Sequence, residues 1–233
     1  MLAVPFLLGI AASRPSPWQA LLLVTAGSGY LASSAALDWI RARRRAYLEP
    51  AALFGAVFVV SGLVLLAAFR RLILTGVVLG PAAAIAAWAA TAGRPRSLAA
   101  SLARAAEALV LVPAAAAVAG PIDGPTVARA ALVAGLYLAS SVLVVRSMIR
   151  ERGNGRFVAA SIGYHLLVVL VEAWVLPWVY AVLALGLAVR AAVLPVLQAR
   201  LADAPRRLRP IHLGLMEIAA SASLVLVAFL VRF

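Results

Sequence analysis

The amino-acid sequence predicts an all-α fold, a polytopic transmembrane helical bundle of eight or nine spans with the N-terminus inside the cell and the C-terminus outside. Three observations support it: the composition, the spacing of apolar stretches and the placement of arginine. Of 233 residues, 65% are hydrophobic and 12% are charged, and the mean hydropathy is +1.05. Soluble domains are about half apolar and about a quarter charged. We therefore expect lipid to be the solvent of most side chains.

A helix needs about 20 apolar residues to cross a bilayer. Eight stretches meet or approach this length: Trp18–Leu37, Pro50–Phe69, Leu72–Ala92, Leu102–Gly120, Thr126–Val145, Phe157–Trp174, Trp178–Gln198 and His212–Val231. The segments between them mix charge with Gly or Pro, which end helices and favour turns. We expect residues 1–233 to form a single integral membrane domain.

The first apolar stretch, Met1–Ala12, is shorter than the others. Twelve helical residues extend about 18 Å, against a hydrocarbon core of about 30 Å. It lacks the basic start of a secretory signal peptide. The sequence therefore indicates either a half-helix, which leaves eight spans, or a ninth span completed by residues upstream of Met1.

All 21 basic residues are arginine, which is typical of GC-rich bacterial coding, and the formal net charge is +13. Fifteen arginines lie in alternate loops: Arg41, Arg43, Arg44, Arg45, Arg94, Arg96, Arg104, Arg146, Arg150, Arg152, Arg156, Arg200, Arg206, Arg207 and Arg209. Five lie on the other side: Arg14, Arg70, Arg71, Arg129 and Arg232. The positive-inside rule places the richer loops in the cytoplasm, in the bacterial inner membrane. Since the arginines serve topology, we expect membrane lipid and no nucleic acid as a partner.

Several polar residues within or beside the spans share a depth of up to about 12 Å from the cytoplasmic helix ends. Ionisable groups in a span are costly and mark cavities, pairs or pathways. We expect a polar cavity open to the cytoplasm, lined by Asp38, Glu49, Glu107, Tyr137, His165, Arg190 and Glu217. In particular, Arg190 and Glu217 should contact each other, directly or through His165 or a bound anion.

The alternative is a set of separate structural pairs. Glu107 could pair with Arg104 one turn away, and Arg190 with Glu217, while His165 bonds a backbone carbonyl. Glu172, near the outer end of its span, is predicted to be interfacial or a partner of Arg129 or Arg232. The Gly76-x-x-x-Gly80 spacing allows a close helix approach, although it is common and is also expected from ordinary packing within the bundle.

Known catalytic motifs are absent from the sequence. There is no cysteine, and the two histidines do not form a His-Glu-x-x-His pair. There is also no Gly-x-Ser-x-Gly elbow and no phosphate-binding loop. We assign no catalytic residue, no metal ligand and no cofactor.

Four short segments resemble the YwiC-like family of bacterial membrane proteins: Met1–Ile10 (MLAVPFLLGI), Arg45–Pro50 (RAYLEP), Val145–Glu151 (VRSMIRE) and His212–Glu217 (HLGLME). In that family the opening apolar run follows a basic His-Gly-Ala-Trp segment. The resemblance implies that such a segment precedes Met1 in the native protein. It implies no molecular function.

The topology is also similar, more distantly, to that of the UbiA prenyltransferases, which have nine spans and the same orientation. In that family, aspartates in the loops after spans two and six hold Mg²⁺ and a prenyl diphosphate. The corresponding loops here carry Asp38 and Glu49, and then only Glu151. The second loop is rich in arginine, and Arg146, Arg150 and Arg152 are candidates to hold an anionic head group directly.

The leading prediction is a non-enzymatic membrane protein whose cavity binds or transports an anionic or lipid-like, isoprenoid-type small molecule. One alternative is a divergent UbiA-like prenyltransferase that requires Mg²⁺ at Asp38, Glu49 and Glu151. Another is an assembly factor for a respiratory complex, which would co-purify with its partner.

Overall fold

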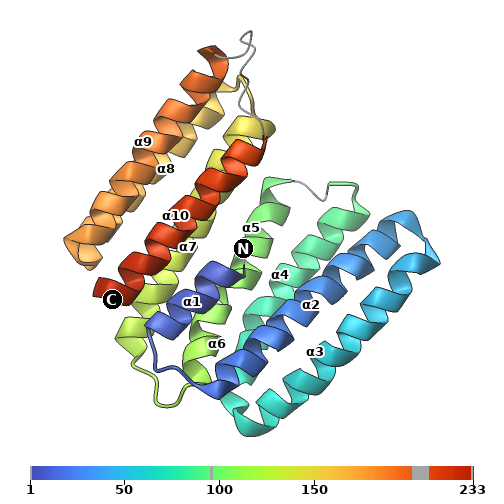
Figure 1. Cartoon of the computed structure of the whole chain (residues 1–233). Coiled ribbons are helices and arrows are strands. Elements are labelled where there is room, and N and C mark those ends of the chain that lie inside the picture. The colour runs from blue at the N-terminus through green and yellow to red at the C-terminus, as the bar shows by residue number, and fades with distance from the viewer. Residues whose placement is uncertain (1, 95–96, 201–209, 232) are drawn as a thin grey trace. The chain divides into compact units, whose positions relative to one another are not determined.

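The computed structural model describes residues 2–94, 97–200, 210–231 and 233, and within them the regular elements are all helices (Figure 1). Eight helical segments there are long and apolar enough to cross a membrane: Pro17–Ile40, Arg45–Ala68, Arg70–Thr91, Leu98–Ala117, Gly124–Ile149, Gly155–Val175, Trp178–Arg200 and Ile211–Val231. The predicted all-α fold is thereby confirmed, with eight candidate spans among the described residues, while a ninth span that includes Met1–Ala12 stays a prediction. Arg96, Arg206, Arg207, Arg209, Arg232 and Pro205 lie outside the described residues.

The helices gather into two compact units, residues Met1–Ala134 (unit 1) and Gly135–Phe233 (unit 2). Helix α7 (Gly124–Ile149) passes through the boundary between them. The single membrane domain over the whole chain stays a prediction, as does the orientation across the bilayer.

Unit 1 consists of helices joined by tight connections, with α2 and α3 packed side by side along their length (Figure 1). Its helices before α7 are α1 (Ala3–Ala11), α2 (Pro17–Ala42), α3 (Leu48–Ala68), α4 (Ile73–Thr91), α5 (Leu98–Leu109) and α6 (Leu111–Ala117). Two short 3₁₀ turns, η1 (Arg45–Tyr47) and η2 (Arg70–Leu72), connect α2 to α3 and α3 to α4. The second turn begins with Arg70 and Arg71, between the predicted spans Pro50–Phe69 and Leu72–Ala92.

The short helix α1 packs closely against α6. A Cβ atom on Gly9 would lie 2.7 Å from both the Val112 carbonyl oxygen and the Ala115 Cβ. Small residues allow such an approach in lipid, where van der Waals packing replaces the hydrophobic effect. With nine residues, α1 extends about 14 Å and cannot cross a bilayer alone.

Polar side chains fix the corner between α1 and α2. Ser16 and Gln19 form a capping box at the start of α2, and Pro17 occupies its first turn, where a missing N–H costs nothing. The Gln19 amide also donates to the Ala115 carbonyl of α6 at 3.1 Å, and the Ser16 hydroxyl donates to the Val118 carbonyl at 3.3 Å. The corner is therefore tied to the same helix that α1 contacts.

The predicted span Leu102–Gly120 is wrong in its boundaries, because the helical segment begins at Leu98 and is interrupted at Val110. Pro113 explains the interruption. A proline lacks the N–H that would bond the carbonyl four residues earlier, and its ring clashes with that carbonyl. The carbonyl belongs to Leu109, the last residue of α5.

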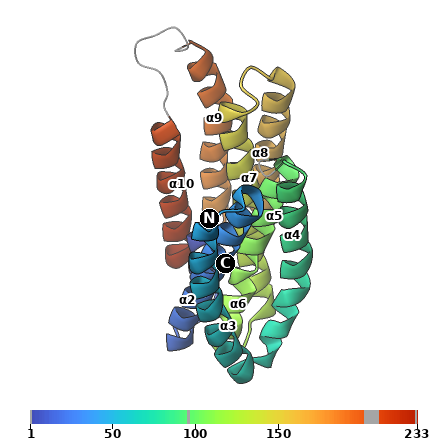
Figure 2. The same cartoon turned by 90° about the vertical axis from the view of Figure 1, so that its right-hand side faces the viewer.

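Unit 2 contains the rest of α7, then α8 (Gly155–Val175), α9 (Trp178–Arg200) and α10 (Pro210–Val231). Helices α8 and α9 are antiparallel neighbours, and α10 runs beside α9 (Figure 2). A core cluster joins α7, α9 and α10 through Val144, Met148, Ala191, Leu194 and Leu213. Large apolar side chains on the outside are exposed, Trp174 by 90% and Leu230 by 73%. Such a surface is stable only against lipid.

The Gly76-x-x-x-Gly80 spacing is not used for a close helix approach within the described chain. A Cβ atom on either glycine would meet nothing within 4 Å. Both glycines lie on α4, whose buried positions are alanines: Ala82, Ala86, Ala89 and Ala90. The close packing in unit 1 is therefore built by alanine faces and by Gly9.

Candidate functional site

The most polar part of the described interior is an ion pair in unit 2. The Arg190 Nη1 of α9 lies 2.7 Å from the Glu217 Oε1 of α10, and the two side chains are only 13% and 19% exposed. The predicted direct contact is thereby confirmed. Opposite charges at matching depth in lipid pair because an isolated charge there is costly.

Helix α7 supplies hydroxyl groups to the same carboxylate and its helix. The Ser141 hydroxyl donates to the Glu217 Oε2 at 2.6 Å. The Tyr137 hydroxyl lies 2.8 Å from the Ser221 hydroxyl and donates to the Glu217 carbonyl at 3.3 Å. Both carboxylate oxygens of Glu217 therefore have partners, and three helices meet at this point.

Helix α8 adds His165, which is 1% exposed. Its Nδ1 lies 2.7 Å from the Ser161 carbonyl oxygen, one turn earlier, as the structural alternative predicted. Because a carbonyl only accepts, Nδ1 carries the hydrogen and Nε2 of the neutral ring is an acceptor. The ring interacts electrostatically with both Arg190 and Glu217.

These four side chains share one layer. Tyr137, His165, Arg190 and Glu217 lie about 10 to 18 Å along their helices from the ends near residues 149, 155, 200 and 210, at 1.5 Å a residue. In a hydrocarbon core of about 30 Å that depth is close to the middle. We call Tyr137, Ser141, His165, Arg190, Glu217 and Ser221 the polar layer of unit 2.

The polar layer has unused hydrogen-bonding capacity. Among the described residues, buried polar atoms without a hydrogen-bond partner include the His165 Nε2 and all three guanidinium nitrogens of Arg190. Arg190 Nη1 is close to Glu217, yet none of its N–H bonds points at an acceptor. The hydroxyls of Ser140 and Ser161, beside the layer on α7 and α8, are also without partners. Buried groups of this kind normally have a protein, water or ligand partner.

The other predicted cavity residues belong to unit 1. Asp38 lies near the end of α2 and is exposed, and Glu49 is exposed in the first turn of α3. Glu107 is half-buried on α5 and interacts electrostatically with Arg104. The cavity predicted from all seven residues stays a prediction.

Unit 1 has two surface hollows, of about 570 and 450 Å³. The first is lined by Ala68–Arg71, Ala117 and Gly120–Ile122. The second is lined by Phe6, Ile10, Pro15–Pro17, Gln19, Ala20 and Leu23.

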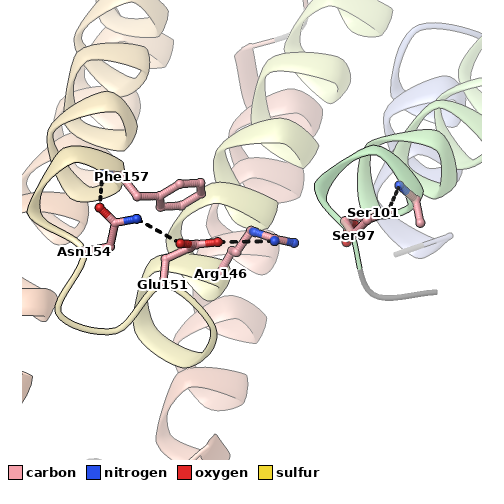
Figure 3. A network of polar contacts seen from close by, with 7 residues as sticks. Ser97, Ser101, Arg146, Glu151, Asn154 and Phe157 are labelled. Atoms are coloured by element: carbon pink, nitrogen blue, oxygen red, sulfur yellow. Dashed lines mark hydrogen bonds and ion pairs between the residues drawn. The ribbon is translucent and has the colours of Figure 1, made fainter. Parts of the chain in front are cut away.

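The arginine-rich loop between α7 and α8 is held together by polar contacts among its own residues (Figure 3). Arg146 pairs with Glu151 at 3.3 Å, and the Asn154 amide donates to the other Glu151 oxygen at 3.0 Å. Asn154 also caps α8 by accepting from the Phe157 N–H. Arg150 and Arg152 are exposed. The Glu151 carboxylate is therefore already bonded by Arg146 and Asn154. Figure 3 also shows the start of α5, where the Ser101 N–H donates to the Ser97 carbonyl.

Glu172, expected at the outer interface or as a partner of Arg129 or Arg232, has a side chain that is 5% exposed on the buried face of α8, and its interfacial depth stays a prediction. It interacts electrostatically with Tyr164 and Tyr180. The signal in the sequence is the spacing of Ser161, His165, Val168 and Glu172, which places them on one helical face. Within the described residues no group of three or more His, Asp or Glu side chains could hold a metal ion.

The helices and their lipid-facing surface define a multi-pass integral membrane protein. The model of the YwiC-like protein family matches residues 1–116, which confirms the resemblance of the chain to that family. No curated protein and no solved structure matches the chain. The matched segment lies within unit 1, so the polar layer of unit 2 is outside it.

Proposed function

We propose that this membrane protein binds a small anionic or lipid-like molecule at the polar layer of unit 2, with Arg190 as its main contact. The observation that carries the proposal is the Arg190 guanidinium, which is buried although no N–H of it is directed at an acceptor. A guanidinium holds phosphate or carboxylate oxygens through paired N–H groups. Leaving such donors unused in lipid is costly, and an anion would satisfy them.

The surroundings of Arg190 support a ligand of limited size with both polar and apolar parts. Tyr137, Ser141 and Ser221 provide hydroxyls on one side, and His165 provides an unpartnered nitrogen. By the arginine rule, the helix ends from which this layer lies about 10 to 18 Å deep face the cytoplasm, so we infer entry from the cytoplasm, in the bacterial inner membrane.

Native mass spectrometry of the purified protein tests this function. We expect an anionic molecule to co-purify with the wild type and to be lost in Arg190→Gln. Arg200→Gln is the matched control, because Arg200 lies on the same helix but is exposed, and this variant should retain the molecule. Equal occupancy in Arg190→Gln, or no bound anion in the wild type, would contradict the proposal.

The alternative of a UbiA-like prenyltransferase rests on the resemblance described above, and it makes a different prediction. Such an enzyme would consume a prenyl diphosphate only with Mg²⁺, and Asp38→Asn, Glu49→Gln and Glu151→Gln would each reduce turnover. A binding protein that acts through Arg190 would hold its ligand after Mg²⁺ is removed by a chelator. The assembly-factor alternative would appear as a co-purifying protein partner instead.

A further inference from the structure

We propose that anion binding at Arg190 is coupled to protonation of His165, so that the site takes up about one proton with each monovalent oxyanion. This inference rests on the proposed function and adds the regulation of the same site. The charge balance of the site supports this coupling. Arg190 and Glu217 neutralise each other at 2.7 Å, and a bound monovalent anion would leave a net negative charge in a low-dielectric layer. Such a charge is expensive unless it is compensated.

His165 is positioned to compensate it. Its Nδ1–H donates to the Ser161 carbonyl, which leaves Nε2 as a buried acceptor without a partner. A proton from the solvent would convert Nε2 into a donor, and the bound oxyanion would accept from it. The new N–H bond forms on Nε2 while Nδ1 keeps its hydrogen, so one positive charge is added for one negative charge.

Glu217 is the other possible proton acceptor, and its contacts argue against it. Arg190 engages its Oε1 and Ser141 donates to its Oε2, so a proton on either oxygen would displace a contact that is already made. The remaining charged or titratable groups near His165 are Arg190 from α9 and, on its own helix, Tyr164, whose ring lies edge-on at 6.0 Å. Glu172 lies about two turns further along the same buried face of α8. Tyrosine and arginine ordinarily keep their charge between about pH 5 and 8, whereas histidine does not.

The ligand class is a monovalent oxyanion such as a phosphate diester, which could come from a lipid head group or from a free solute. Dimethyl phosphate is a suitable free probe because its charge does not change between about pH 5 and 8. We would titrate it into the wild-type protein in phosphatidylcholine nanodiscs by calorimetry, in buffers of different ionisation enthalpy. The difference between buffers gives the number of protons taken up.

We expect about one proton per anion, with an affinity that falls about tenfold for each pH unit where His165 is neutral in the unliganded protein. His165→Gln should bind more weakly, without proton uptake and without pH dependence. His212→Gln replaces the chain's other histidine, exposed at the start of α10, and should behave as the wild type. Glu217→Gln leaves Arg190 with a net positive charge and should bind the anion more tightly, without a proton.

The outcomes separate the two proposals. If the wild type binds no dimethyl phosphate and no phosphatidylglycerol at any pH, the proposed function fails. If it binds with no proton uptake, or if His165→Gln still takes up a proton, the coupling is wrong and the binding function stands. Loss of dimethyl phosphate binding in phosphatidylglycerol nanodiscs identifies a lipid head group at the site, and unchanged binding identifies a free anion; either source supports the coupling when the proton is counted.

Discussion

Units 1 and 2 solve the problem of polar side chains in lipid in different ways. In unit 1, the buried hydroxyls of Thr25, Ser28 and Ser61 donate to carbonyls three or four residues earlier on their own helices. In unit 2, Tyr137 and Ser141 reach from α7 to α10. The buried polar atoms without hydrogen-bond partners, among the residues that the structure describes, also belong to unit 2.

This difference indicates where to look for function. Unit 1 contains the whole segment that matches the YwiC-like family. Its described interior combines an apolar cluster that includes Phe6, Leu22 and Leu65 with alanine faces and close contacts at Gly9 and Gly29. Unit 2 instead contains a largely buried ion pair and unpartnered polar atoms near the middle of the hydrocarbon core, and both lower its stability. Proteins tolerate such costs where binding or transport requires them. The two units should therefore respond differently to substitution.

The largest expected effect is that of Arg190→Ala. Removing the guanidinium leaves the Glu217 carboxylate buried without its charged partner, which should lower the free energy of unfolding by about 3–5 kcal/mol. The measurement is an SDS titration in detergent micelles. Adding Glu217→Gln to this variant should recover part of the loss, because the stranded charge is gone. Arg200→Ala, at an exposed position, should change stability by less than about 0.5 kcal/mol.

A smaller effect is expected in unit 1 for Gly9→Ala. The new Cβ would lie 2.7 Å from the Val112 carbonyl oxygen, and a backbone atom cannot move away as a side chain can. We expect a loss of about 1–3 kcal/mol in the same titration. Gly27→Ala is the control, because its Cβ would meet nothing within 4 Å, and it should stabilise α2 by about 0.5–1 kcal/mol. Equal effects of the two variants would show that α1 and α6 do not pack closely.

A still smaller effect is expected for Gln19→Ala at the corner of α1 and α2. The Gln19 side chain bonds Ser13, Arg14, Ser16 and Ala115, but the corner lies at a helix end, where water can replace part of these bonds. We expect a loss of about 1 kcal/mol. Ser33→Ala, which removes one exposed bond to the Tyr30 carbonyl, should have no measurable effect.

The fourth prediction concerns membrane topology rather than stability. It tests which ends of the helices of unit 2 face the cytoplasm. Reporter fusions at Asn154 and Pro205 should report the cytoplasm, and fusions at Asp123 and Phe233 the exterior, because fifteen arginines lie on the first side and five on the second. An exterior signal at Asn154 would reverse the orientation and, with it, the inferred entry route.

Hydropathy predicted the helices within a few residues, because a spanning helix must be continuous and apolar. The expected span Pro50–Phe69, for example, corresponds to α3 (Leu48–Ala68). The break in front of Pro113 could have been predicted from that proline alone. The packing of α1 on α6 could not, because it joins residues about 100 positions apart whose apolar side chains carry no mark of their partner.

The polar layer could likewise be predicted from the sequence only in part. Arg190 and Glu217 could be paired from the sequence because charges of opposite sign at equal depth in lipid need each other. Ser141 and Ser221 were missed because serine is common in helices and its partner depends on helix rotation, which the sequence does not fix. The burial of Glu172 was missed because its depth was considered and its helical face was not.

The loop between α7 and α8 has a consequence for the membrane surface. Its Glu151 is neutralised by Arg146 at 3.3 Å, while Arg150, Arg152 and Arg156 are exposed. An anionic leaflet attracts each such side chain by about 1 kcal/mol, within a Debye length of about 8 Å. With this loop on the cytoplasmic side, the three arginines together concentrate negatively charged lipid heads at the ends of α7 and α8, and added salt disperses them.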